Sequence, residues 1–176
     1  LNSEYEDPSY IHQYLSSRIF NEIGIPCFKS EHIRVYINGK YHGLFLQIEN
    51  MDTQFLEARN LDAEGSLYKA TKNSASLSIY DDIDSLWEKK TNTAANWSDL
   101  QNLIDELNSV PDSSYYEWAK ETFDYNNMIN MLTVNLLLSN ASTYYHNYYM
   151  YNDMNISGKW FMFPWDLDKT YNTYNA

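Results

Sequence analysis

Apolar residues in the first half of the chain recur with helical and then with strand periodicity. Ile11, Leu15, Ile19 and Ile23 recur every four residues, which predicts a helix over residues 11–23. The Asp7-Pro8 pair supplies a capping acceptor and a proline suited to the first helical turn, while Gly24 and Pro26 end the helix.

Two alternating segments follow this helix. Residues 33–37 and 41–48 alternate apolar and polar positions on either side of Asn38-Gly39, a pair that favours a type I′ turn. This pattern predicts a β-hairpin. Residues 51–59 fit a short helix that begins after Asp52, and residues 66–70 fit a further strand.

The second half is predicted to be mainly helical. Residues 71–95 have weak periodicity and many polar positions, which indicates a loop with one strand near residues 77–80. An amphipathic helix is expected over residues 97–107, with Asn96 as its cap and Pro111 beyond its end. Residues 125–139 are apolar around most of a helical circumference, so we expect that helix to lie in the core.

The last predicted element is a second hairpin. Two aromatic runs, residues 146–151 and 159–165, flank a polar stretch that contains Ser157-Gly158. Because a hairpin returns its end to its beginning, Asn147 and Asp166 should lie side by side. An amide oxygen beside one or two carboxylates, the second from Asp168, is an oxygen site suited to Mg²⁺ or Mn²⁺ holding a phosphate chain. The order of elements indicates an α+β architecture.

Composition narrows the choice of function. A chain of 176 residues with 44% hydrophobic content can form one domain, or most of one, around a packed core. The formal charge of -12 opposes nucleic-acid binding and favours basic or neutral macromolecular partners. The single cysteine, Cys27, makes thiol redox chemistry and a zinc cluster improbable, and no apolar run reaches the length of a membrane span. The start at Leu1 is typical of a processed form or an excised piece.

Several motifs along the chain together resemble the spore-coat protein H (CotH) kinase family, a group of atypical protein-kinase-like enzymes. In chain order they are residues 34–44, Glu49 with Phe55-Leu56, residues 65–70, residues 90–92, residues 146–149 and residues 164–168. The resemblance implies a kinase-like fold in which residues 1–176 lack upstream N-lobe sequence. It also implies binding of ATP with Mg²⁺ or Mn²⁺, phosphoryl transfer to serine or threonine of protein substrates, and an extracellular, cell-surface or spore-coat location in a bacterium.

The family's functional positions can be carried over residue by residue. Asp166 resembles the metal-binding aspartate and Asn147 the catalytic-loop asparagine. Lys69 could supply a cation to the phosphates, with Glu49 orienting it, as a Lys–Glu pair does in ordinary kinases. The alternative is that Lys69 and Glu49 form a surface ion pair of little energetic value.

One position departs from the family pattern. Where the family has Asn-x-Asp, whose aspartate resembles the catalytic base, this chain reads Asn140-Ala141-Ser142. A serine hydroxyl is a poor proton acceptor at neutral pH, so transfer to a protein substrate, one rich in serine or threonine and basic, is expected to be impaired. Ser142 therefore favours an alternative, a non-catalytic pseudokinase or structural module. A further alternative is carbohydrate binding, motivated by 17 tyrosines and by Trp97, Trp118, Trp160 and Trp165.

Overall fold

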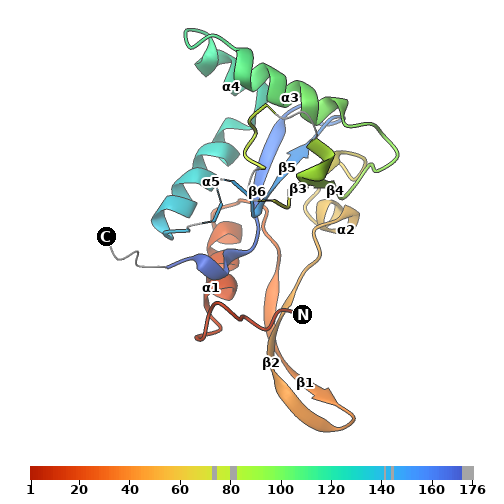
Figure 1. Ribbon diagram of the computed structural model, residues 1–176, viewed down its shortest axis with the longest axis vertical. Helices are drawn as coiled ribbons and strands as arrows, with labels where there is room; N and C mark the ends of the chain where they lie inside the picture. The colour runs from red at the N-terminus through yellow and green to blue at the C-terminus, as the bar shows by residue number, and fades with distance from the viewer. Residues whose placement is uncertain (73–74, 80–82, 141, 144, 172–176) are drawn as a thin grey trace.

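The computed structural model is a mixed α and β domain with two antiparallel sheets and five α-helices among the residues it describes, which are 1–72, 75–79, 83–140, 142–143 and 145–171 (Figure 1). The elements in chain order are α1 (His12–Glu22), β1 (Ser30–Ile37), β2 (Lys40–Ile48), α2 (Thr53–Glu57), β3 (Ser66–Ala70), the 3-10 helix η1 (Ile83–Ser85), β4 (Trp87–Lys89), α3 (Ser98–Ser109), α4 (Tyr115–Thr122), α5 (Tyr125–Leu137), β5 (Tyr148–Asn152), β6 (Trp160–Pro164) and the 3-10 helix η2 (Leu167–Lys169).

A four-stranded antiparallel sheet in the order β4-β3-β5-β6 forms the centre of the molecule. All five residues of β5 are buried, and their aromatic side chains stack against those of β6, as in the Tyr151–Phe163 pair with ring centroids 5.6 Å apart. Burial of each such ring stabilises the fold by about 1.5–3 kcal/mol. The predicted C-terminal hairpin is therefore confirmed, with Tyr148 opposite Pro164 at its open end.

The predicted N-terminal hairpin is also confirmed and forms the second sheet. The strands β1 and β2 pair in antiparallel fashion and extend away from the rest of the molecule (Figure 1). A bulge between Val35 and Tyr36 shifts the register close to the turn. Asn2 bridges to Leu46 on the other edge of β2, which brings the N-terminal segment against the base of the hairpin.

The helix α1 is confirmed, but its buried face is polar. Gln13, Ser16, Ser17 and Phe20 are buried, whereas Ile11, Leu15 and Ile23 are exposed. The reason is a set of hydrogen bonds rather than an apolar contact, since the Ser16 hydroxyl lies 2.9 Å from the Thr170 hydroxyl just after η2. Pro8 lies before the helix rather than in its first turn. The Asp7 carboxylate still caps the start of the helix, because it accepts hydrogen bonds from the Ile11 and His12 amides.

The expectation that residues 125–139 lie wholly in the core is wrong in part. The inner face of α5 buries Asn127, Met131, Val134 and Asn135, whereas Leu136 and Leu137 are 69% and 76% exposed. Two asparagines lie on the buried face of α5, where the periodicity predicts apolar residues. Each is buried because its side chain forms a hydrogen bond with a neighbouring segment. The Asn127 side-chain oxygen accepts the Met162 amide of β6 at 2.7 Å, and Asn135 bonds to the loop that follows α5.

Residues 71–95 contain a short strand in a different place from the predicted one. β4 covers Trp87–Lys89, where β3 supplies its partner, while residues 77–79 form no strand and residue 80 lies outside the described residues. The helix α4 was not predicted; none of its residues is fully buried, although Trp118 and Ala119 pack against the core. The other predicted helices, α2 and α3, are present.

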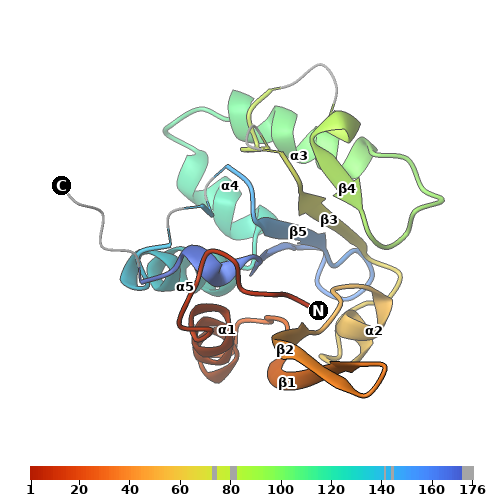
Figure 2. The same ribbon diagram turned by 60° about the horizontal axis from the view of Figure 1, so that its bottom comes forward.

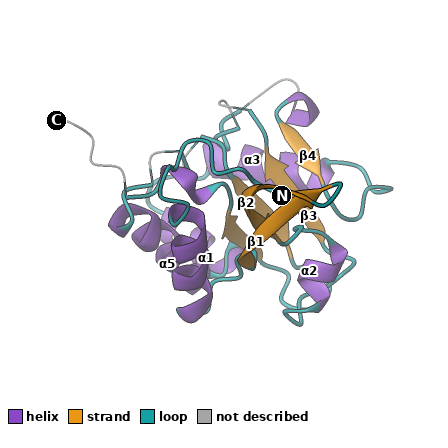
Figure 3. Ribbon diagram, turned by 90° about the horizontal axis from the view of Figure 1, so that it is seen from below, coloured by secondary structure: helices purple, strands orange, loops and turns teal. Residues whose placement is uncertain are grey.

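The 3-10 helix η2, blue in Figure 2, lies beside α1 and close to the end of α5. Figure 3 shows α1 and α5 as neighbours. Hydrogen bonds hold η2 and the residues around it from both sides. The His12 Nδ1 atom lies 2.9 Å from the Asp168 carbonyl oxygen, and the Tyr171 amide donates to the Leu138 carbonyl oxygen at 2.6 Å. This arrangement fixes the backbone around Asp166 and Asp168. Within the described residues, no helix has both the length and the apolar character needed to cross a bilayer.

Candidate functional site

The candidate site lies at the open end of the β5–β6 hairpin. One residue beyond the last strand pair, the Trp165 amide donates to the Asn147 carbonyl oxygen at 3.2 Å. The Asn147 side chain forms a hydrogen bond with the Asp166 carboxylate, which acts to lower the pKa of that carboxyl. The structure thus places Asn147 and Asp166 side by side, as the hairpin pattern predicts.

Both residues have left-handed backbone conformations, with φ of 63° for Asn147 and 52° for Asp166. This conformation costs an ordinary residue roughly 1–2 kcal/mol, and Asn and Asp tolerate it better than other non-glycine residues. The chain therefore turns sharply just before β5 and shortly after β6. Strained backbone held in place by surrounding structure is a frequent property of functional sites.

A chain of buried polar side chains connects Asn147 to α5. The Asn147 Nδ2 atom donates to the Ser142 hydroxyl at 3.2 Å, and the Ser142 hydroxyl donates to Asn140 Oδ1 at 3.3 Å. The Asn140 amide in turn donates to Asn135 Oδ1 at 2.8 Å and to the Thr143 hydroxyl at 2.7 Å. Ser142 therefore lies beside Asn147, next to the Asp166 carboxylate. The supporting amide of Asn135 was missed, since a buried asparagine in a helical pattern resembles a surface residue.

Burial dominates the electrostatics of Asp166. It raises the pKa of that carboxyl above its ordinary value, although the cations Lys69, His146 and Lys169 and the Asn147 hydrogen bond all act to lower it. The pKa of Asp168 rises to about 6, first through burial and second through repulsion by Asp166. Two carboxylates that are short of compensating charge would be stabilised by a bound cation.

The donor atoms suit a hard divalent cation. Asp168 Oδ1 is buried without a hydrogen-bond partner, and Asp166 and Asn147 supply further oxygens. Within the described residues, no group of three or more His, Cys, Asp or Glu residues could hold a metal by itself. This limited set fits Mg²⁺, because Mg²⁺ takes one or two protein carboxylates and completes its shell with phosphates and water. His146 Nδ1 is also buried without a partner, but a nitrogen is a weaker ligand for Mg²⁺.

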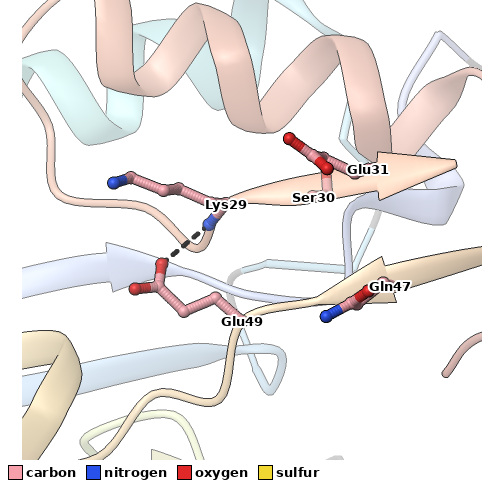
Figure 4. A pocket seen from close by; sticks show the side chains of 5 residues that line it. All are labelled: Lys29, Ser30, Glu31, Gln47 and Glu49. Carbon is pink, nitrogen blue, oxygen red and sulfur yellow. Dashed lines mark hydrogen bonds between the residues drawn. The ribbon is translucent and has the colours of Figure 1, made fainter.

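The expected Lys69–Glu49 pair does not form; Glu49 pairs with Arg59. The Glu49 carboxylate accepts from both terminal nitrogens of Arg59, at 2.7 and 3.1 Å, and from the Lys29 amide at 2.8 Å (Figure 4). Arg59 follows α2 and returns to the end of β2, which brings it to Glu49. Lys69 instead extends from β3 over the Trp165 ring, with Nζ 4.8 Å from the ring centroid.

Lys69 therefore lies on the Asp166 side of the sheet. Burial lowers the pKa of its ammonium, and the carboxylates of Glu88 and Asp166 act in the opposite direction. A desolvated cation beside a carboxylate of a metal site can neutralise part of the charge on a phosphate chain. The position of Lys69 fits its predicted contact with phosphate, without Glu49 as the orienting partner.

Among the hollows at the base of the N-terminal hairpin, two are lined in part by Glu49. One has a volume of about 300 Å³ and is lined by Lys29, Ser30, Glu31, Gln47 and Glu49 (Figure 4). The other, of about 290 Å³, is lined by Leu1, Asn2, Ile48, Glu49, Asn50 and Trp165. The second hollow thus borders Trp165, the residue that directly precedes Asp166.

The four tryptophans that motivated carbohydrate binding do not make an open platform. Trp160 is buried, and Trp97, Trp118 and Trp165 pack against the core with part of each ring covered. Trp165 has its ring against Phe28 and Tyr149. Sugar stacking needs a row of solvent-facing rings, and these four side chains serve the core instead.

Comparison with known proteins gives concordant matches. The family model described as CotH kinase protein matches residues 1–176. The chain is also similar to inner spore coat protein H of Bacillus subtilis (strain 168), with 32% identity over 179 residues that cover 97% of this chain and 49% of the relative. The chain thus spans about half the length of the curated relative that it matches.

Proposed function

The chain belongs to the CotH kinase protein family, and from this membership we propose that it binds ATP with Mg²⁺ or Mn²⁺ and transfers phosphoryl groups to serine or threonine of a protein substrate. The observation that carries the proposal is the contact between Asn147 and Asp166 at the open end of the β5–β6 hairpin. Phosphoryl transfer asks a protein mainly to position reactants and to neutralise charge, and this pair can hold the metal ion that does both.

Each residue of the site has a proposed role. Asp166 and Asn147 hold the metal, with Asp168 as a further oxygen ligand, and the metal supplies charge neutralisation on the phosphate oxygens. Lys69 contributes a cation from β3, and its ammonium group lies over the Trp165 ring. The hollow beside Trp165 is the proposed entrance for the nucleotide.

Ser142, at the position expected for the catalytic base, is a poor proton acceptor. Ser142 is 1% exposed and its hydroxyl is engaged with Asn140 and Asn147, so it has little freedom to accept a proton from a substrate. In a loose transition state the nucleophile loses its proton late, so slow transfer remains compatible with serine at this position. The same observation supports a second candidate function, a pseudokinase that binds nucleotide without transferring phosphate.

The similarity to a spore coat protein supports a location in the coat of a bacterial spore. The net charge of -12 supports a basic or neutral protein substrate, because a strongly acidic surface attracts basic segments. Both points concern the whole protein, of which this chain can be one part.

Transfer from γ-labelled ATP to a basic, serine-rich acceptor protein tests the proposal. The kinase function predicts incorporation that requires Mg²⁺ or Mn²⁺ and disappears in Asp166→Asn. Nucleotide binding without incorporation would identify the pseudokinase. Absence of both would refute nucleotide chemistry at this site.

A further inference from the structure

We propose that Glu4 and Asp168 form a binding site for a second hard divalent cation, next to the Asn147–Asp166 site. This site goes beyond the proposed function, because it requires neither nucleotide nor phosphoryl transfer. The observations that carry it are two buried carboxylate oxygens without partners and a helix face that holds both residues in place.

The Glu4 side chain is buried and only half satisfied. The residue is 2% exposed, its Oε1 atom accepts a hydrogen bond from Gln13 Nε2 at 2.7 Å, and its Oε2 atom is buried with no hydrogen-bond partner. An ionised carboxylate buried in this way is costly unless a cation or a further donor compensates it. The three charges that act most strongly on Glu4 are all carboxylates, those of Asp168, Asp7 and Asp166, which makes the space around it strongly acidic.

Asp168 contributes the second incomplete carboxylate. Its Oδ1 atom is also buried without a partner. The residue lies in η2, two positions after Asp166, and its carbonyl oxygen is held by His12. Glu4 and Asp168 are thus held by two neighbouring residues of α1, Gln13 and His12, and each has one buried oxygen without a partner that a hard cation can bind. Because Asp168 is also a proposed ligand of the first cation, it would lie between the two sites.

Asp7 provides an internal comparison. Its carboxylate accepts hydrogen bonds from the Ser9, Ile11 and His12 amides and from the Ser9 hydroxyl. Burial acts to raise the pKa of Asp7, but these hydrogen bonds outweigh it and lower the pKa. The fold therefore satisfies one carboxylate of the cluster completely with its own donors and leaves Glu4 and Asp168 short of them.

The polar buried face of α1 is the platform for this site. Gln13 holds Glu4, His12 holds the Asp168 backbone, and Ser16 holds Thr170 after η2. These three residues occupy the face where the apolar pattern would place aliphatic side chains. A second cation site would explain why this face of α1 is polar, since the face holds two acidic residues from opposite ends of the chain.

Titration of Mn²⁺ into the nucleotide-free protein, followed by calorimetry, tests the site. Wild-type protein should bind Mn²⁺ at a site that is lost in Glu4→Gln and kept in Asp166→Asn. Glu22→Gln is the control, because Glu22 is an exposed carboxylate at the end of α1, and this variant should bind Mn²⁺ as wild-type protein does. Circular dichroism spectra of the variants show whether each one is folded.

The expected result is a decrease of one bound Mn²⁺ per chain in Glu4→Gln, with a loss of at least about tenfold in affinity if binding is only weakened. An unchanged Mn²⁺ stoichiometry and affinity in Glu4→Gln would overturn the site and would mean that Glu4 is compensated by a proton. Absence of Mn²⁺ binding in wild-type protein would overturn it as well. Neither failure bears on nucleotide binding, which is measured separately with Asp166→Asn.

Discussion

Asn147, one residue beyond the last strand pair of the β5–β6 hairpin, lies beside Asp166, two residues beyond that pair, and its side-chain hydrogen bond acts to lower the pKa of the Asp166 carboxyl. Both have left-handed backbones, so the chain turns sharply at each of them. The open end of the hairpin thus carries two side chains that can supply oxygen ligands. The central claim of our account is that this pair binds the metal of a nucleotide.

Asn147→Gly separates the role of the amide from that of the backbone. Glycine adopts φ of 63° without strain, so we expect a change in unfolding free energy of less than about 1 kcal/mol. Affinity for ATP with Mn²⁺ should fall at least about tenfold, since one oxygen ligand is removed. Fluorescence titration and urea denaturation measure the two quantities. Equal losses of stability and affinity would mean that Asn147 acts only on the fold.

Ser142→Asp is expected to increase the rate of phosphoryl transfer. A carboxylate beside Asn147 can accept the proton of a substrate hydroxyl, and general bases contribute about 10²–10⁴-fold to rates. We expect an increase of at least about tenfold in kcat in a γ-phosphate transfer assay. Ser142→Asn is the control of similar size that cannot act as a base. An equal rate in both variants would remove position 142 from the transfer step.

A double-mutant cycle distinguishes the Glu49–Arg59 pair from a Glu49–Lys69 pair. Glu49→Gln and Arg59→Met should show a coupling energy of about 1–3 kcal/mol in urea denaturation, because Glu49 and Arg59 are joined by two short hydrogen bonds. Glu49→Gln and Lys69→Met should show none. Coupling in the second cycle alone would support the kinase-type pairing that the structure does not form.

The stabilisation that the Glu49–Arg59 pair gives to the folded protein should decrease at acidic pH. Burial acts to raise the pKa of Glu49, but the Arg59 and Lys29 bonds outweigh it and lower the pKa below the ordinary value of 4.5. The stabilisation is thus complete above about pH 4.5 and is lost as pH falls through the folded-state pKa. In Glu49→Gln the free energy of unfolding should therefore decrease less at acidic pH than in wild-type protein.

Glu4 predicts the opposite dependence in metal-free protein. Burial is the largest cause that raises its pKa from 4.5 to about 7, so between these values the folded protein binds a proton that the unfolded chain has released. The free energy of unfolding should therefore decrease as pH rises from about 4.5 to about 7, by roughly 1–3 kcal/mol. Urea denaturation in the presence of EDTA should show this decrease in wild-type protein and in Glu22→Gln, and a smaller one in Glu4→Gln. An identical decrease in Glu4→Gln would exclude Glu4 as its source.

The sequence predicts local pairing well in this protein. Asn38-Gly39 and Ser157-Gly158 lie between alternating or aromatic runs, and turn geometry alone then fixes which residues face each other. For this reason the juxtaposition of Asn147 and Asp166 follows from the sequence without knowledge of the rest of the fold.

Contacts between distant segments could not be predicted in the same way. The buried faces of α1 and α5 carry Gln13, Ser16, Asn127 and Asn135, whose partners lie on other elements, so the apolar pattern pointed to the wrong faces. Glu4 has no local signal either, because its burial depends on α1 and on Asp168 at the other end of the chain. Arg59 was overlooked as the partner of Glu49 for the same reason.

The most direct test of the central claim is a thermal-shift titration with ATP in the presence and absence of Mn²⁺, on wild-type protein and on Asp166→Ala. A ligand that binds only the folded state must stabilise it, by about 2.7 kcal/mol at a concentration one hundred times its Kd. Our account predicts a rise in Tm of wild-type protein that requires both ATP and Mn²⁺ and is absent in Asp166→Ala. A rise of equal size in Asp166→Ala, or no rise in wild-type protein, would contradict the assignment of Asn147 and Asp166 as the metal-nucleotide site.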